Sequence, residues 1–157
     1  MFILPRYTDV GRRGMGIPAS GLEIDGSLRD IYVFDTSIAI WNRFLDLLYD
    51  SSYQCQCFSN GDVVTHFRSF QQIKEVQLSH KTLLTISLSE GATINCHFFV
   101  EDEIEMDMDP RDFQSESNVL ILEKFLTWLS CSLDRQVTLT HENSPDHQIY
   151  KVNSADA

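Results

Sequence analysis

The sequence predicts an α+β fold: a mainly antiparallel sheet of about six to seven strands, with two amphipathic helices packed on one face. Two observations lead to this expectation. Apolar residues alternate with polar ones in several short segments, and they recur every three or four positions in two longer ones. The predicted strands also follow one another through short turns without regular alternation with helices, which is typical of antiparallel sheets rather than doubly wound ones.

The helices and the N-terminal region are predicted from periodicity and composition. Residues 1–27 hold five of the seven glycines, so we expect a loop-like N-terminal arm. Helices are expected at 37–49 and 119–133, where the apolar side chains form a stripe, and a short helical turn at 69–76. At 157 residues the chain fits one domain, 1–157, and its last residues, 153–157, are expected to fray.

The strands are predicted from short segments that are rich in β-branched and aromatic residues. Asn60-Gly61 and Glu90-Gly91 indicate two hairpin turns, because these pairs tolerate the positive φ angles that tight turns need. Strands are predicted at 28–34, 53–58, 62–67, 82–89, 92–100, 136–140 and 148–152, and an extended acidic segment follows the fifth of them.

The net charge of −11 and the pI near 4.7 narrow the classes of partner. Nucleic acid and anionic membrane surfaces are disfavoured, because both are bound through clustered Lys and Arg. A basic protein partner is favoured by charge, although plain solubility explains the same composition. No apolar run is long enough to span a membrane, and Pro5 and Arg6 interrupt the N-terminal apolar residues where a signal peptide would continue. We therefore expect a cytoplasmic protein.

The densest block of charge lies at 101–112, where seven acidic residues accompany Arg111 alone. Apolar residues fall on even positions from Ile94 onwards, whereas the acids fall mainly on odd positions, so an extended chain would place the two sets on opposite faces. We predict that the acids form a partner-binding face; a merely solvated face is the alternative. The predicted binding residues are Glu101, Glu103, Glu105, Asp107 and Asp109.

No motif in the sequence indicates catalysis, a metal or a cofactor. The carboxylates suit Ca²⁺ or Mg²⁺ chemically, but the glycine and the distal glutamate of an EF-hand loop are missing, and we predict no metal site and no cofactor. Cys96 and His97 would face opposite sides of a strand, so they cannot pair for catalysis. His141 and Glu142 lack a nucleophile elbow nearby. We predict buried free thiols at Cys55, Cys57, Cys96 and Cys131.

The C-terminal half resembles the small acidic α+β immunity proteins of bacterial toxin–immunity pairs. The likeness covers residues 95–152 and consists of an amphipathic helix at 121–133, the sequence VTLTHEN at 137–143, a short strand at 148–150 and the acidic segment ahead of them. The resemblance implies a non-enzymatic protein that binds a toxin domain, such as a nuclease, and covers its active site. A row of carboxylates would then take the place of nucleic-acid phosphates on a basic surface.

Two other functions fit the same sequence. A secretion chaperone is also small, acidic and cytoplasmic and often forms a homodimer, but this sequence ends in a predicted strand rather than in a long amphipathic helix. An enzyme of unknown type is the third reading. Exposed apolar area beside the acids would support a binding protein, whereas a deep pocket with converging polar groups would support an enzyme.

Overall fold

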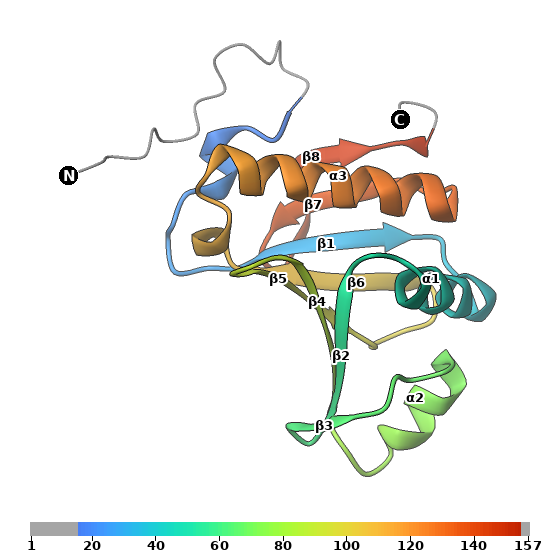
Figure 1. Cartoon of the computed structure of the whole chain (residues 1–157). Coiled ribbons are helices and arrows are strands. Elements are labelled where there is room, and N and C mark those ends of the chain that lie inside the picture. Colours follow the sequence, from blue (N-terminus) through green and yellow to red (C-terminus); the bar gives the residue numbers. More distant parts are fainter. Residues whose placement is uncertain (1–15, 155–157) are drawn as a thin grey trace.

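The fold is α+β, as predicted: the described residues of the computed structural model, 16–154, form one antiparallel sheet of eight strands with three α-helices (Figure 1). The strand order is β3-β2-β4-β5-β6-β1-β7-β8. The rest of the predicted arm and tail, 1–15 and 155–157, lies outside the described residues. The strands are β1 (Arg29–Phe34), β2 (Gln54–Ser59), β3 (Asp62–Val64), β4 (Thr82–Ser89), β5 (Ala92–His97), β6 (Glu103–Met108), β7 (Val137–His141) and β8 (Ser144–Val152). The helices are α1 (Ile38–Asp50), α2 (Phe70–Val76) and α3 (Glu116–Leu133), with 3-10 turns η1 (Ala19–Leu22) and η2 (Pro110–Asp112).

Several boundaries differ from the prediction. The sheet has more strands than expected, because the acidic segment forms a full strand, β6. The expected helical turn is a third helix, α2, and the Ser69 side chain caps its first turn. β3 ends at Val64, and β5 ends at His97 rather than at residue 100. β8 begins at Ser144, because Asn143 adopts a φ of 54° and closes a tight turn after β7.

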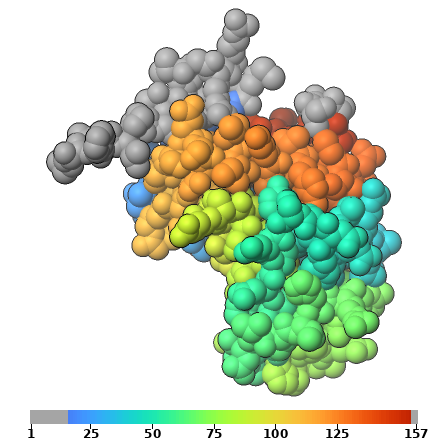
Figure 2. All heavy atoms as spheres, viewed as in Figure 1, coloured from blue at the N-terminus to red at the C-terminus, as the bar shows by residue number. Residues whose placement is uncertain are grey.

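A hydrophobic core lies between the helices and one face of the sheet. Ile31 of β1 and Met106 of β6 are cross-strand partners on this face, and both are fully buried. From α1, the Trp41 ring stacks on Phe70 of α2 with the ring centroids 5.0 Å apart. Phe125 of α3 belongs to the same core. Figure 2 shows atoms of α3 (orange) and α1 (cyan) next to each other, in agreement with the contacts between these two helices.

The opposite side of the sheet, here called the outer face, is mainly polar along the three central strands, β1, β5 and β6. Successive strand residues point to opposite sides, so every core residue of the central strands alternates with an outer-face residue. The outer-face residues of the three central strands are Asp30, Tyr32 and Phe34 in β1, Thr93, Asn95 and His97 in β5, and Glu103, Glu105 and Asp107 in β6.

The described part of the N-terminal arm is fastened to the fold. Ile17 is buried, and its backbone N–H donates to a carboxylate oxygen of Glu123 in α3 over 2.9 Å. Arg29 is only 1% exposed, and its Nε donates to the backbone carbonyl of Gly21 over 2.7 Å. Its guanidinium also donates to other oxygens of the same loop, so it joins the arm to the first strand.

The four cysteines are free thiols in different surroundings. Cys57 and Cys96 are buried in the core, and Cys55 is half-buried. Cys131 is exposed on α3, so the prediction that all four thiols are buried is wrong for this residue. Its side chain lies on the polar side of a helix whose apolar stripe faces the core.

Candidate functional site

Three of the five predicted binding residues lie together on the outer face of β6. Glu103, Glu105 and Asp107 are half-buried and alternate with fully buried apolar residues, as the period of two predicts. Their carboxylates therefore point away from the core along one strand. Adjacent carboxylates are separated by roughly 7 Å along the strand, two residues at about 3.4 Å each.

The other two predicted residues do not continue this row. Glu101 lies in the bend between β5 and β6, where it is exposed. Asp109 caps η2, and its carboxylate accepts hydrogen bonds from the backbone N–H of Arg111 and from its guanidinium, the closest over 2.7 Å. These bonds hold the pKa of Asp109 below its usual range. Glu101 and Asp109 therefore lie outside the strand that carries the other three acids, and their part in partner binding stays a prediction.

The register of the sheet places further ionisable groups beside the β6 carboxylates. Asp107 is the cross-strand partner of Asn95 in β5 and of Asp30 in β1. The Asn95 amide donates to Asp107 over 3.1 Å, and His97 Nε2 lies 2.5 Å from the other carboxylate oxygen of Asp107. Asp107 is thus engaged within the protein, whereas Glu103 has no hydrogen-bond partner recorded among the described residues.

A second set of contacts joins β1 to β6. The Tyr32 hydroxyl lies 3.3 Å from a carboxylate oxygen of Asp30 and 3.4 Å from one of Glu105. Asp30 also accepts a hydrogen bond from the backbone N–H of Asn143 over 2.8 Å. One hydroxyl proton cannot serve both carboxylates fully, so this cluster keeps unused acceptor capacity on Glu105.

The electrostatics of the outer face favour an added cation. Burial raises the pKa of Asp30. Burial and the neighbouring charges of Asp30 and Glu103 raise the pKa of Glu105. The hydrogen bond that the His97 ring donates to the Asp107 carboxylate raises the pKa of His97. All three shifts mean that the cluster binds a proton more readily than isolated side chains do, and a positively charged group would relieve the same crowding.

Aromatic rings flank the β6 carboxylates on both sides. Tyr32 and Phe34 of β1 stack with their ring centroids 5.2 Å apart and their planes at 10°. On the β5 side, the His97 ring stacks on Phe99 at 5.2 Å and 7°. Phe99 is 57% exposed, so a large apolar ring lies at the surface next to the acids. Sequence reasoning missed both ring pairs, although Tyr32 and Phe34 share the even positions of β1, and His97 at the end of β5 and Phe99 in the following bend share odd positions.

More apolar surface continues along the sheet from β5 towards β3. Phe58 of β2 pairs with Leu83 of β4 and with Val63 of β3, and Val63 is 63% exposed. Phe58 and Leu83 line a shallow hollow of about 330 Å³. Since neighbouring strands place these residues on the same side as the β6 carboxylates, the outer face combines an acidic half with an apolar half.

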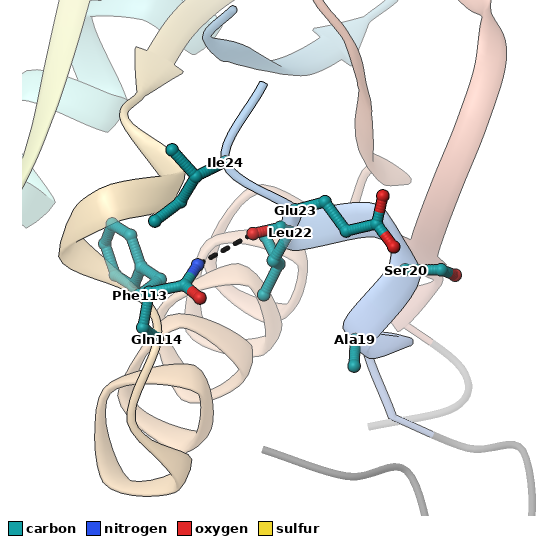
Figure 3. Close-up of a pocket in the computed structure, with 7 residues that line it drawn as sticks. All are labelled: Ala19, Ser20, Leu22, Glu23, Ile24, Phe113 and Gln114. Atoms are coloured by element: carbon teal, nitrogen blue, oxygen red, sulfur yellow. Dashed lines mark hydrogen bonds between the residues drawn. The ribbon is translucent and has the colours of Figure 1, made fainter. Parts of the chain in front are cut away.

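The larger hollows of the described residues lie elsewhere. One of about 560 Å³ lies between η1 with the residues just after it and the segment that joins η2 to α3 (Figure 3). There the Gln114 side chain donates to the backbone carbonyl of Leu22 over 2.7 Å, so its amide is used within the protein. Another, of about 670 Å³, is bordered by His66, which stacks on Tyr49 with the centroids 4.2 Å apart. Neither lining includes a cysteine. Burial raises the pKa of Cys55, which lies near the second hollow, to about 12, so this thiol stays protonated at neutral pH.

The residues that the structure describes were also searched for metal-binding groups and membrane-spanning helices, and the chain was compared with known proteins. Among residues 16–154, no three His, Cys, Asp or Glu side chains are arranged to hold a metal ion. No helix in that part of the chain has the length and apolar composition needed to cross a membrane. No family model matches the chain, and neither the curated proteins nor the solved structures contain a match.

Proposed function

We propose that this protein is a non-enzymatic binding module of the immunity type, which neutralises a basic protein partner, such as a nuclease toxin, through its outer face. The observation that carries this proposal is the exposed Phe99 ring, which stacks on His97, the cross-strand partner of Glu105. Apolar area next to acids is the arrangement expected of a protein-binding surface. In the two larger hollows formed by residues 16–154, no lining hydroxyl or thiol is hydrogen-bonded to a base of the same lining, and we propose no reaction.

The chemistry of the face suits arginine and lysine side chains. A guanidinium binds a carboxylate through two parallel hydrogen bonds, and it also stacks on aromatic rings. Glu103 is the cross-strand partner of Phe34, so a cation bound to its carboxylate would also be close to an aromatic ring. Phe99 lies in the bend that leads from β5 to β6, two residues after His97, on which it stacks. Contacts of this kind add attraction beyond simple charge pairing.

Neutralisation of a nuclease would follow from charge mimicry. A nuclease binds the phosphates of its substrate with Lys and Arg, and a row of carboxylates roughly 7 Å apart presents negative charge to the same groups. Complementary charge also speeds association and makes it sensitive to salt. The proposal therefore predicts a complex that forms rapidly at low ionic strength and weakens as salt is added.

The proposal is tested with two variants that lose equal negative charge: one loses acids of the outer face and of the bend before β6, and the other loses acids elsewhere on the surface. The first variant combines Glu101→Gln, Glu103→Gln and Glu105→Gln; Asp107 is left intact because it is bonded to Asn95 and His97. The control variant combines three exposed acids of α1, α2 and the β4–β5 turn: Asp50→Asn, Glu75→Gln and Glu90→Gln. Each variant removes three negative charges.

The measurement is capture of partners by the tagged full chain in its native cells at low and high salt, followed by titration of the captured protein. We expect a basic protein that wild type and control hold at low salt and release at high salt. The outer-face variant should bind it at least about tenfold more weakly. Equal binding by both variants, or capture of no basic protein, would overturn the proposal.

A further inference from the structure

We infer that the bend between β5 and β6, residues 98–102, is a preformed anchor that places Phe99 against an apolar depression in the basic partner. This inference rests on the proposed function and specifies the partner: its surface carries an apolar patch bordered by Lys or Arg. The bend lies between α1 and α2, which both bond to it (Figure 1).

The backbone of the bend is held at every residue. Five successive carbonyl oxygens, outside any strand, accept hydrogen bonds from neighbouring elements. Lys74 Nζ donates to the carbonyls of Phe98 and Phe99, and Gln77 Nε2 also donates to that of Phe98. Trp41 Nε1 donates to the carbonyl of Val100. The hydroxyl and the backbone N–H of Thr36 donate to the carbonyls of Glu101 and Asp102, respectively. The distances run from 2.7 to 3.1 Å. A connection between two strands thus has a hydrogen-bond donor for each of its five carbonyls.

The side chains on this fixed backbone are exposed and apolar at its centre. Phe98 is buried, but Phe99 is 57% exposed and Val100 is 42% exposed. The Phe99 ring has one side stacked on His97, which is itself bonded to Asp107. The ring therefore has a defined orientation with its other side towards solvent. A rigid exposed aromatic ring is the type of side chain that dominates binding energy in protein interfaces, because little entropy is lost when it docks.

The charges around the bend determine what it binds. Glu101 and Asp102 are exposed in the bend, and Glu103 starts β6 directly after it. The Lys74 ammonium, which would offset them, is directed at the two carbonyls. A second copy of this chain would bring the same acids against themselves, which costs free energy, whereas a partner with a basic rim gains from them.

The test uses two peptide probes of equal charge: an acetylated and amidated octamer of alternating lysine and leucine, and the same octamer with serine in place of leucine. Both are titrated by fluorescence anisotropy against the full chain, its Phe99→Ser variant and its Ile24→Ser variant. Ile24 is the matched control, because it is 58% exposed and lies away from the bend, after η1. Thermal unfolding verifies that the variants fold, and sedimentation gives the state of association.

We expect the wild type and Ile24→Ser to bind the leucine peptide about tenfold more tightly than the serine peptide, and Phe99→Ser to lose this preference. If the wild type binds both peptides equally and Phe99→Ser changes nothing, the anchor is wrong while the proposed charge-based function stands. If neither peptide binds, the proposed function fails and the anchor with it. A wild-type dimer that Phe99→Ser dissociates would also overturn the inference, since the occupant would then be a second copy.

Discussion

Replacing Lys74 by methionine removes the cation that holds the bend while keeping a side chain of similar length. Lys74 Nζ donates to the carbonyls of Phe98 and Phe99 over 2.7 Å each. It also lies 5.3 Å from the centroid of the Phe70 ring. Gln77 still bonds to the Phe98 carbonyl in the variant, and water can reach the Phe99 carbonyl.

The expected loss of stability is about 1.5 kcal/mol. Two hydrogen bonds from a charged donor contribute about 1 kcal/mol each, and the ring contact adds about 0.5 kcal/mol. Burial opposes these contributions: it lowers the pKa of Lys74, so removing the ammonium returns part of the loss. For a chain of this size, 1.5 kcal/mol lowers Tm by about 3–6 °C.

The assay is urea unfolding together with hydrogen exchange of the amides from residue 98 to residue 103. Lys124→Met on the exposed side of α3 is the control, with an expected change below about 0.5 kcal/mol. The variant should also bind the leucine peptide more weakly than wild type although Phe99 is intact, because the bend is no longer preorganised. Equal stability and equal exchange in Lys74→Met and Lys124→Met would refute the assignment of Lys74 as the residue that fixes the bend.

Three further substitutions test the arm and the outer face. Arg29→Lys should lower the free energy of unfolding by about 3 kcal/mol in urea titrations, because an ammonium cannot reach all the loop oxygens that the guanidinium serves; a loss below 1 kcal/mol would contradict this role. Glu105→Gln should stabilise the free protein by about 0.5 kcal/mol at pH 7 by removing repulsion from Glu103. Because the pKa of Glu105 is raised, this gain should disappear below pH 4.5, where the wild-type glutamate is protonated; a gain that persists there has another cause. His97→Gln should cost most stability below pH 6.5, because the pKa of His97 is raised in the fold and the charged ring stabilises the fold through Asp107. The difference in stability from wild type should shrink as pH rises through that raised pKa. A constant difference from pH 5 to 9 would argue against the charged pair.

The sequence predicted the fold class because local patterns determine it. The alternation from Ile94 to Met108 identified both β5 and β6, and Asn60-Gly61 marked its hairpin correctly. The same alternation extended β5 too far, to residue 100. The alternation of apolar and polar residues continues unbroken through the bend. Nothing in the local sequence shows that Trp41 and Lys74 donate to the carbonyls of Val100 and Phe98, which in a longer strand would accept hydrogen bonds from a neighbouring strand.

The arrangement of the acids was predicted correctly only where one strand carries them. The β6 acids are adjacent in sequence, so their shared face follows from the period of two. Asp30 and Tyr32 come from a strand more than 70 residues earlier, and only the pairing of β1 with β6 brings them to Asp107 and Glu105. Sequence periodicity gives the face of each strand but not its neighbours, so the aromatic pairs and the shared hydroxyl of Tyr32 required the structure.

The placement of like charges is what links the fold to the proposed function. Asp30 and Asp107 are direct cross-strand partners, and like charges in this position destabilise a sheet by up to about 1 kcal/mol. Thr140, the other cross-strand partner of Asp30, illustrates an uncharged residue that fits the same face without repulsion. Asp30 and Asp107 therefore repel each other in the free protein, and the hydrogen bonds that they accept from Asn143, Asn95 and His97 offset part of this repulsion. The proposed basic partner would reverse the sign of this contribution, because a carboxylate that repels its neighbour in the free protein would attract a cation in the complex. Repulsion in the free state and salt-sensitive affinity in the bound state are then two effects of one charge arrangement.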